Sequence, residues 1–402
     1  MINIAILGFG VVGSGVADLL TKNSDCARRL GGDEINIKYI LDLRDFPNSP
    51  FADRVIHDFN IILSDPEVSC VVEVMGGSHP AYEYTIAALR SGKSVITSNK
   101  EVVSKYGDEF LKVAKDNGVC YRFEAAVGGG IPVISPMINC IGQNKIGEVR
   151  GILNGTTNYI LTQMFSHGAT FEDALKDAQN KGYAERNPDA DVLGTDACRK
   201  IAILTALATG KLLPTDKLHT EGITAIRRED VECAAGIGMK IKLLGRCIIT
   251  SKGMQVMVAP FMISDNSPLA TVSGVYNAIE VVGDPIGNIM FYGQGAGAGA
   301  TASAVVGDLM QIMRSGRSYA EPVWEKTEDG LLDIKKFKSR HYIAMTDVER
   351  SAVIRELGDA EVVGLGDELA VITPEMSEKD ISKAIKALKK SGAEILSQIR
   401  LI

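Results

Sequence analysis

The chain has 402 residues, of which 46% are hydrophobic and 23% charged, and its formal net charge is −7. This length is too great for a single hydrophobic core, so we expect a globular protein of two or three domains. The negative charge without a clustered basic surface argues against a nucleic-acid partner, no apolar run is long enough to span a membrane, and the seven scattered cysteines predict neither a disulfide framework nor a zinc site.

The N-terminus carries a nucleotide-binding pattern. A short β-favouring run, Ile2–Leu7, leads into glycines spaced Gly-x-Gly-x-x-Gly, and a helical pattern follows through Val16 and Leu20. Between a strand and a helix such glycines permit a tight turn, and the helix N-terminus offers N–H donors to a pyrophosphate. A generic tight turn is the alternative. We expect the dinucleotide contacts to come from Gly8, Phe9, Gly10, Val11, Val12 and Gly13.

The second predicted strand, residues 36–43, bears on the choice of cofactor. An acidic residue at this strand end accepts hydrogen bonds from the ribose hydroxyls of NAD, whereas a nearby arginine suits the 2′-phosphate of NADP. The sequence has both, in Asp42 and Arg44. We therefore expect NADP to be accepted and NAD to be usable, with an ordinary polar strand exit as the alternative.

Strands and helices alternate up to about residue 125. Further strands are predicted at 69–75, 94–97 and 119–124, with helices at 80–90 and 109–117. This alternation predicts an α/β fold with a doubly wound parallel sheet. Ligands bind at the carboxyl ends of the strands in such sheets, which places Lys100 near the cofactor.

Residues 124–132 interrupt this alternation with a carboxylate and a run of three glycines. The segment favours a hinge out of the first domain. A glycine turn after a carboxylate also exposes several carbonyl oxygens, which are the ligands that hard cations prefer.

Beyond this hinge, mixed strands and helices predict an α+β substrate domain. A run of small polar residues, 154–158, precedes a helix at 159–165, where it can cap the helix or hold a polar ligand. Strands are predicted at 242–250, 254–259 and 276–282.

Residues 182–200 form a charged loop that leads into an apolar helix. Asp196 and Lys200 are four residues apart, so they share one helix face, which Leu204 continues. An acid–base pair on the same helix face as apolar core residues is more readily directed into a cleft than into bulk water. An ordinary exposed ion pair is the alternative.

The C-terminal third has three predicted parts. Glycine-rich residues 293–300 lead into a helix at 301–314, which favours a cofactor-facing turn at a helix N-terminus over a flexible linker. Residues 325–338 are charged and are predicted to be a linker. From residue 341 onward, the predicted order is β-α-β-β-α-β, the ferredoxin-like motif.

Six of these segments together resemble homoserine dehydrogenase, and they occur in the same order. The resemblance implies NAD(P)-dependent reduction of L-aspartate 4-semialdehyde to L-homoserine, a step toward threonine, methionine and isoleucine. The alternatives are another Rossmann-type semialdehyde or hydroxy-acid dehydrogenase, and a catalytically silent NAD(P)-binding regulator. The matching segments are 8–15, 72–77, 92–100, 124–132, 154–161 and 182–200.

The resemblance also implies roles for individual residues of the substrate site. Lys200 is expected to donate a proton to the aldehyde oxygen as hydride arrives, and Lys100 to act as a second catalytic lysine. The substrate's amino end is expected to be held by Glu185 and Asp196, with Asn154 and Thr156 alongside.

Two further sets of residues match the family's cofactor and cation contacts. Gly182 and Gly297 match glycines that contact the cofactor. A sodium ion is implied, held mainly by carbonyl oxygens of Glu124, Val127, Gly129 and Ile131.

We therefore expect a cytoplasmic enzyme with no signal peptide, assembled as a homodimer or, alternatively, a tetramer. An NAD(P)-binding Rossmann domain should span residues 1–131 and be completed by the helix at about 301–317. A catalytic and dimerisation domain should span 132–300, and an ACT-like module 341–402.

The resemblance of residues 341–402 to ACT domains, which sense amino acids, raises one question about regulation. Such modules usually have a glycine in the first strand–helix turn, where this chain has Ser351. A Cβ is unfavourable where φ must be positive. We therefore expect the module to have kept its fold but lost its effector, with weak or absent inhibition by threonine. A purely structural or assembly domain is the alternative.

Overall fold

A computed structural model of the chain describes residues 1–315, 321–364 and 368–402. The chain forms two compact units, each assembled from separate stretches of sequence. The first contains residues 1–146, 202–217 and 283–328, and the second contains residues 147–201, 218–282 and 329–402. Within the described residues, no helix combines the length and the apolar character that crossing a bilayer would require.

The first unit is built on a six-stranded sheet with the order β3-β2-β1-β4-β5-β6, in which every neighbouring pair is parallel. This strand order is that of a Rossmann fold, and it confirms the predicted doubly wound parallel sheet. The strands are β1 (Ile2–Leu7), β2 (Ile35–Leu41), β3 (Val55–Ile56), β4 (Val68–Glu73), β5 (Ser94–Thr97) and β6 (Tyr121–Arg122).

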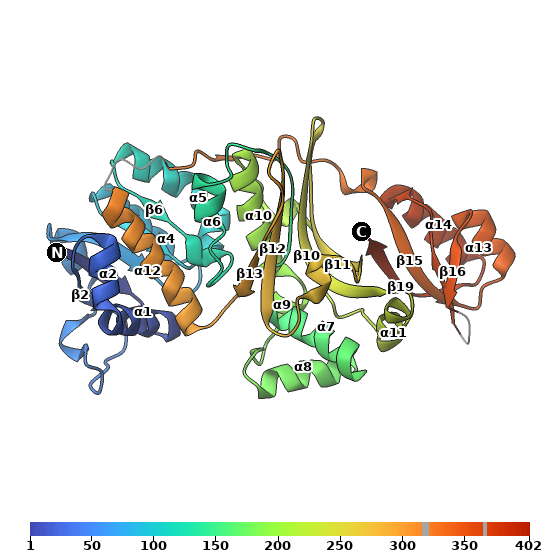
Figure 1. The fold of residues 1–402 in the computed structure, drawn as a ribbon, viewed down its shortest axis with the longest axis horizontal. Coiled ribbons are helices and arrows are strands. Elements are labelled where there is room, and N and C mark those ends of the chain that lie inside the picture. Colours follow the sequence, from blue (N-terminus) through green and yellow to red (C-terminus); the bar gives the residue numbers. More distant parts are fainter. Residues whose placement is uncertain (316–320, 365–367) are drawn as a thin grey trace. The chain divides into compact units, whose positions relative to one another are not determined.

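Helices bury the sheet of the first unit. Ile4 and Ile6 of β1 are fully buried in one hydrophobic cluster with Val16 of α1 and with Val305 and Leu309 of α12. Helix α12 lies alongside α1 (Figure 1). The late helix α12 therefore packs in the same hydrophobic cluster as β1 and α1. The helices are α1 (Val11–Lys22), α2 (Ser24–Gly31), α3 (Phe59–Ser64), α4 (Ala81–Arg90), α5 (Lys100–Asp116), α6 (Ile134–Asn139) and α12 (Ala298–Ser315).

The second unit is built on a mixed sheet that contains the order β12-β7-β10-β11-β19-β15-β17-β16. The long hairpin of β10 and β11 is antiparallel, and its buried face packs with Leu269 and Val272. The strands up to β12 are β7 (Lys145–Ile152), β9 (His219–Thr220), β10 (Met239–Thr250), β11 (Gly253–Ser264) and β12 (Tyr276–Asp284). The helices are α7 (Gly155–His167), α8 (Phe171–Asn180), α9 (Asp189–Val192), α10 (Thr195–Thr209) and α11 (Arg228–Gly236), and the second half of α10, from Ala202 onward, belongs to the first unit.

The C-terminal segment has the predicted order β-α-β-β-α-β. Its four main strands follow the order β19-β15-β17-β16 and are antiparallel, while β19 also pairs in parallel with β11. The segment therefore extends the sheet of the second unit. Its elements are β15 (Lys338–Thr346), α13 (Arg350–Leu357), β16 (Glu361–Gly364), β17 (Leu369–Ile372), β18 (Met376–Ser377), α14 (Glu378–Lys390) and β19 (Glu394–Leu401).

Several predicted elements need correction. Helix α5 begins at Lys100 instead of residue 109, because the Asn99 side chain caps it by accepting from the Glu101 and Val102 amides. The start of the predicted glycine-rich loop belongs to β13 (Gly287–Gln294), and α12 begins three residues earlier than predicted. Residues 316 and 317 of that predicted helix lie outside the described residues.

Two predictions about the C-terminal third are wrong. Residues 325–338 are not a simple linker, since β14 (Glu325–Lys326) pairs with β8 (Lys211–Leu212) and Phe337 is buried. Ser351 lies inside α13, whereas the positive φ of the preceding turn, 53°, is at Asp347. The conformational argument that Ser351 disfavours an effector therefore fails.

Candidate active site

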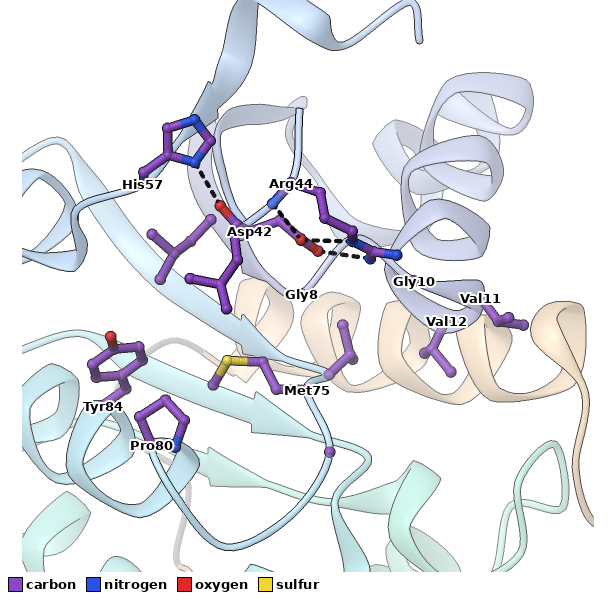
Figure 2. Close-up of a pocket in the computed structure, with 14 residues that line it drawn as sticks. Gly8, Gly10, Val11, Val12, Asp42, Arg44, His57, Met75, Pro80 and Tyr84 are labelled. Atoms are coloured by element: carbon purple, nitrogen blue, oxygen red, sulfur yellow. Dashed lines mark hydrogen bonds and ion pairs between the residues drawn. The ribbon is translucent and has the colours of Figure 1, made fainter. Parts of the chain in front are cut away.

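A cavity of about 590 Å³ opens at the carboxyl ends of β1, β2 and β4 in the first unit. Four residues of the Gly-x-Gly-x-x-Gly segment line it, together with both charged residues that follow β2 (Figure 2). This is where a Rossmann sheet binds a dinucleotide. The labelled lining residues are Gly8, Gly10, Val11, Val12, Asp42, Arg44, His57, Met75, Pro80 and Tyr84.

The glycines of this turn are required by its backbone. Gly8 has a φ of 94°, which side chains rarely tolerate. A Cβ added to Gly13 would lie 2.0 Å from the Gly8 carbonyl oxygen. Gly10 has no atom within 4 Å of such a Cβ and faces the cavity, which leaves its backbone open to a ligand. Of the predicted contacts, Phe9 and Gly13 are buried beneath this surface.

Asp42 and Arg44 form one ion pair at the cavity wall. The Arg44 guanidinium donates from Nε and Nη2 to the Asp42 carboxylate at 3.0 and 3.1 Å (Figure 2). The Phe9 amide donates to the same carboxylate at 2.8 Å. The bond from Arg44 is the main cause that lowers the pKa of Asp42 to about 2, against the opposing effect of burial. Both groups predicted to face the ribose are therefore charged and adjacent.

A buried carboxyl that the sequence did not indicate joins the ends of β4 and β5. Glu73, at the end of β4, accepts from the Thr97 hydroxyl at 2.6 Å and from the Met75 amide at 2.9 Å. Burial raises the pKa of Glu73 to about 7. The backbone amide of Asn99 donates to the Thr97 hydroxyl, and the Asn99 side chain donates to the Gly77 carbonyl. This network fixes the start of α5, where Lys100 is the first residue.

The second unit holds a polar cluster around Lys200. Its ammonium lies 2.9 Å from the Asp196 carboxylate and donates to the Leu153 carbonyl at 2.7 Å. The side chains of Lys200 and Asp196 are only 9% and 6% exposed, so the alternative of an ordinary surface ion pair is wrong. Asn154 donates to Asp196 at 2.9 Å and to Asp191 at 2.7 Å.

Asp191 belongs to this cluster, although no motif or spacing distinguishes it from the other acids of its loop. Burial, with a contribution from the Asp196 charge, raises the pKa of Asp191 above its usual range. Asn154 links both carboxylates to α7, which it caps by accepting from the Thr157 amide. Two carboxylates, one ammonium and one amide are thus held together, with a net formal charge of −1 when all ionise.

Of the remaining predicted substrate and cofactor residues of this region, Gly182 and Glu185 lie on the loop before α9 and Thr156 lies in the first turn of α7. The Thr156 hydroxyl donates to the Tyr183 carbonyl at 2.6 Å, next to Gly182, whose φ is 73°. Glu185 is exposed, and its carbonyl oxygen accepts from the Gln179 amide group. The structure thus brings Asn154, Asp196 and Lys200 together, and leaves the Glu185 carboxylate on the exposed part of the loop.

Glu124 is buried at the start of the predicted cation segment, but its carboxylate has a structural role. It accepts from the amides of Val133, Ile134 and Ser135 at 2.7, 2.8 and 2.7 Å, and so caps α6. The chain then passes through Gly129, whose φ is 57° and whose Cβ would lie 2.4 Å from the Gly295 carbonyl oxygen. In the part of the chain that the structure describes, no group of three or more His, Cys, Asp or Glu side chains could hold a metal ion.

Comparison with known proteins identifies the family. The family profile described as homoserine dehydrogenase matches residues 132–310, and the profile of that enzyme's NAD-binding domain matches residues 8–124. The chain is 37% identical to a homoserine dehydrogenase of Synechocystis sp., with 100% of this chain and 99% of the relative covered. The chain belongs to the homoserine dehydrogenase family.

Solved structures of the family agree with this assignment. A homoserine dehydrogenase from Thiobacillus denitrificans superposes with a TM-score of 0.89 at 34% identity, covering 100% of this chain and 98% of that one. A hyperthermophilic archaeal homoserine dehydrogenase, a mutant in complex with NADPH, gives a TM-score of 0.65 at 28% identity over 77% of this chain and 97% of that one.

Membership of the homoserine dehydrogenase family makes the chain an NAD(P)-dependent oxidoreductase of amino-acid biosynthesis. The two alternatives considered from the sequence, a dehydrogenase of another semialdehyde or hydroxy acid and a silent NAD(P)-binding regulator, are not favoured.

Proposed function

We propose that the chain interconverts L-aspartate 4-semialdehyde and L-homoserine, with Lys200 as the proton donor to the aldehyde oxygen. The observation that carries this role is the buried ammonium, fixed by Asp196 and by the Leu153 carbonyl. When bound, NADPH or NADH supplies the hydride that reduces the aldehyde carbon. Negative charge then develops on the aldehyde oxygen, and a positioned ammonium both stabilises that charge and gives up the proton.

The other residues of the cluster fit an amino-acid substrate. Asp196 keeps Lys200 in place and, with Glu185, binds the substrate ammonium. Asn154 fixes the Asp196 carboxylate from the opposite side, and Thr156 holds the loop at Tyr183. Lys100, at the N-terminus of α5, serves as the second catalytic lysine beside nicotinamide and substrate. These assignments follow the family resemblance and the residue types.

A direct test of this reaction uses purified protein, L-aspartate 4-semialdehyde and NADPH or NADH, and follows the near-ultraviolet absorbance of the reduced nicotinamide. We expect oxidation of the cofactor only with the semialdehyde present, and the reverse signal with L-homoserine and the oxidised cofactor. Turnover of a different hydroxy acid at a higher kcat/KM than L-homoserine would contradict the proposed substrate.

Replacing Glu185 with Ala should raise the KM for L-aspartate 4-semialdehyde by about tenfold, the scale of one charge-assisted hydrogen bond, and leave kcat nearly unchanged. The reason is that Glu185, on an exposed loop, would bind the substrate ammonium in ground and transition states alike. Steady-state kinetics measure both constants. Glu172→Ala, which removes another exposed carboxylate, is the control. A loss of kcat at constant KM would assign Glu185 to the chemical step instead.

The cofactor is NADP or NAD, and we propose that the cavity accepts both. The residues fit a dinucleotide, because the glycine turn admits close backbone approach and the Asp42–Arg44 pair offers a carboxylate to the ribose and a cation to a 2′-phosphate. Gly297, with a φ of 114° directly before α12, and Gly182 are proposed as further cofactor contacts.

Arg44→Ala should raise the KM for NADPH by about tenfold and the KM for NADH much less. The substitution removes the guanidinium that would meet the 2′-phosphate, whereas Asp42 keeps its bond from the Phe9 amide and can still bind the ribose hydroxyls. The two cofactors measured on the same variant serve as each other's control. Equal changes in both constants would show that Arg44 does not face the 2′ position.

We also propose a sodium ion at the 124–131 segment, bound by the carbonyl oxygens of Glu124, Val127, Gly129 and Ile131. The donor set is the supporting observation. Since the Glu124 carboxylate already accepts three amide hydrogens, a cation here has to be bound by neutral backbone oxygens, which suit a hard monovalent ion.

The domain assignment is proposed on the same basis. Residues 1–131 with α12 form the NAD(P)-binding Rossmann domain, residues 132–300 the catalytic and dimerisation domain, and residues 341–402 an ACT-like module. The strand order β19-β15-β17-β16 with two helices supports the last assignment. We propose a cytoplasmic homodimer, with a tetramer as the alternative assembly.

A further inference from the structure

A buried arginine, Arg400, is one of the links between the C-terminal segment and the rest of the second unit. Arg400, in the last strand β19, is 3% exposed. Its guanidinium donates to both oxygens of Glu378, at 2.6 and 3.0 Å, and to both oxygens of Glu221, at 2.7 and 2.9 Å. One side chain therefore joins β19, the start of α14 and the chain just after β9.

Arg400 bonds both oxygens of each of the two carboxylates around it. Burial would raise the pKa of Glu221, but the bonds from His219 and Arg400 outweigh it and lower that pKa to about 2. His219 lies 2.6 Å from the same carboxylate. A bidentate, charge-assisted pair of this kind fixes direction as well as distance.

The segment that contains Glu221 is in direct backbone contact with the loop that precedes α10. The Ile223 amide donates to the Val192 carbonyl at 2.8 Å, and a Cβ on Gly222 would lie 2.1 Å from that same oxygen. On the other side, a Cβ on Gly194 would lie 3.3 Å from the Glu221 carbonyl oxygen. The backbones of residues 221–223 and 192–194 are therefore in close contact, so one segment cannot shift without displacing the other.

The loop of residues 192–194 stands between two members of the Lys200 cluster. It follows Asp191, which accepts from Asn154, and it leads into α10, which carries Asp196 and Lys200. A shift of this loop would therefore change the spacing between Asp191, Asp196 and Lys200.

We propose that Arg400 and Glu221 are positioning residues for the substrate side of the active site, and that the C-terminal segment supports the Lys200 cluster through residues 192–194. The proposal rests on the function proposed above for Asp196 and Lys200. It assigns the last strand of the chain a role in turnover that does not require any effector molecule.

Loss of Arg400 should not detach the C-terminal segment. β19 still pairs with β11 at Phe261 and Met262, and the buried Asp230 carboxylate still accepts from the Ser397 and Tyr342 hydroxyls, at 2.7 and 3.3 Å. These contacts allow a variant at Arg400 to be tested as a folded protein.

The test compares Arg400→Met with Arg340→Met, a matched control in the adjacent strand β15 whose guanidinium is 50% exposed and pairs with Glu361. We expect Arg400→Met to lower kcat/KM for L-aspartate 4-semialdehyde by about tenfold, as a small misplacement of catalytic groups does, with the KM for NADPH changed by less than about twofold. Arg400→Lys, which keeps the charge but loses the fork, should recover part of the loss. Arg340→Met should match the unsubstituted enzyme.

Amide hydrogen exchange separates positioning from stability and does not depend on activity. In Arg400→Met, exchange should rise at residues 191–198 and stay unchanged in α5, which belongs to the other unit. A lower melting temperature with unchanged kcat/KM and unchanged exchange at 191–198 would overturn the proposal. If Arg400→Met does not fold, Glu221→Gln, which keeps the size of the side chain, is judged by the same two readouts. Full activity of Lys200→Ala would instead refute the proposed function, while the exchange result would still decide this inference.

Discussion

Replacing Lys200 with Ala should lower kcat by about two orders of magnitude or more, the usual contribution of a positioned proton donor. The ammonium is buried, and its contacts with Asp196 and the Leu153 carbonyl fix its direction. Without it, the developing negative charge on the aldehyde oxygen has neither a neighbouring cation nor a proton source. Because the interaction forms mainly in the transition state, kcat and kcat/KM should fall together.

The control for Lys200→Ala is Lys22→Ala, which removes a lysine from another pair of Asp and Lys spaced four residues apart. The Lys22 and Asp18 side chains are 74% and 60% exposed, so that substitution should change neither kcat nor the melting temperature. Circular dichroism must show that Lys200→Ala is folded, since Asp196 loses its partner. Near-normal turnover by a folded Lys200→Ala enzyme would refute the assigned role.

The features that the sequence predicted correctly are those carried by local spacing. The glycine turn after β1, the alternation of strands and helices, and the shared helix face of Asp196 and Lys200 all lie within short stretches of chain. The ferredoxin-like order of the C-terminal segment was predictable for the same reason, since each of its elements has a clear period. Whether Asp196 and Lys200 were buried could not be decided locally, because it depends on what packs over their helix.

The features that the sequence missed depend on contacts between distant segments. Asp191 is one of several acids in its loop, and only the Asn154 amide, 37 positions away, distinguishes it. In the sequence, Glu73 is a single polar residue in an apolar strand, and its hydrogen-bond partner Thr97 lies in the next strand of the sheet. The bond between Arg400 and Glu221 joins positions 179 apart. No periodicity or motif spacing can indicate such pairs, because they arise only when the sheets assemble.

Gly13→Ala should disrupt the nucleotide turn and raise the KM for both NADPH and NADH by more than about tenfold. The new Cβ would lie 2.0 Å from the Gly8 carbonyl oxygen and 3.4 Å from the Ile6 side chain, and the nearest of these atoms is backbone, which cannot rotate away. Either α1 or the turn at Gly8 must shift. Overpacking of this kind costs roughly 1–3 kcal/mol of stability. Kinetics with both cofactors and thermal unfolding measure the two effects.

Gly307→Ala makes the same chemical change in α12, where the new Cβ would have no atom within 4 Å. Replacing a glycine inside a helix with alanine stabilises it by roughly 0.5–1 kcal/mol, so this control should melt slightly higher and bind both cofactors normally. If Gly13→Ala binds both cofactors as tightly as Gly307→Ala does, the close packing of α1 on Gly8 is not what shapes the site. Because Gly13→Ala acts on backbone that both nucleotides share, whereas Arg44→Ala acts only at the 2′ position, the two variants together separate the shape of the cavity from its charge.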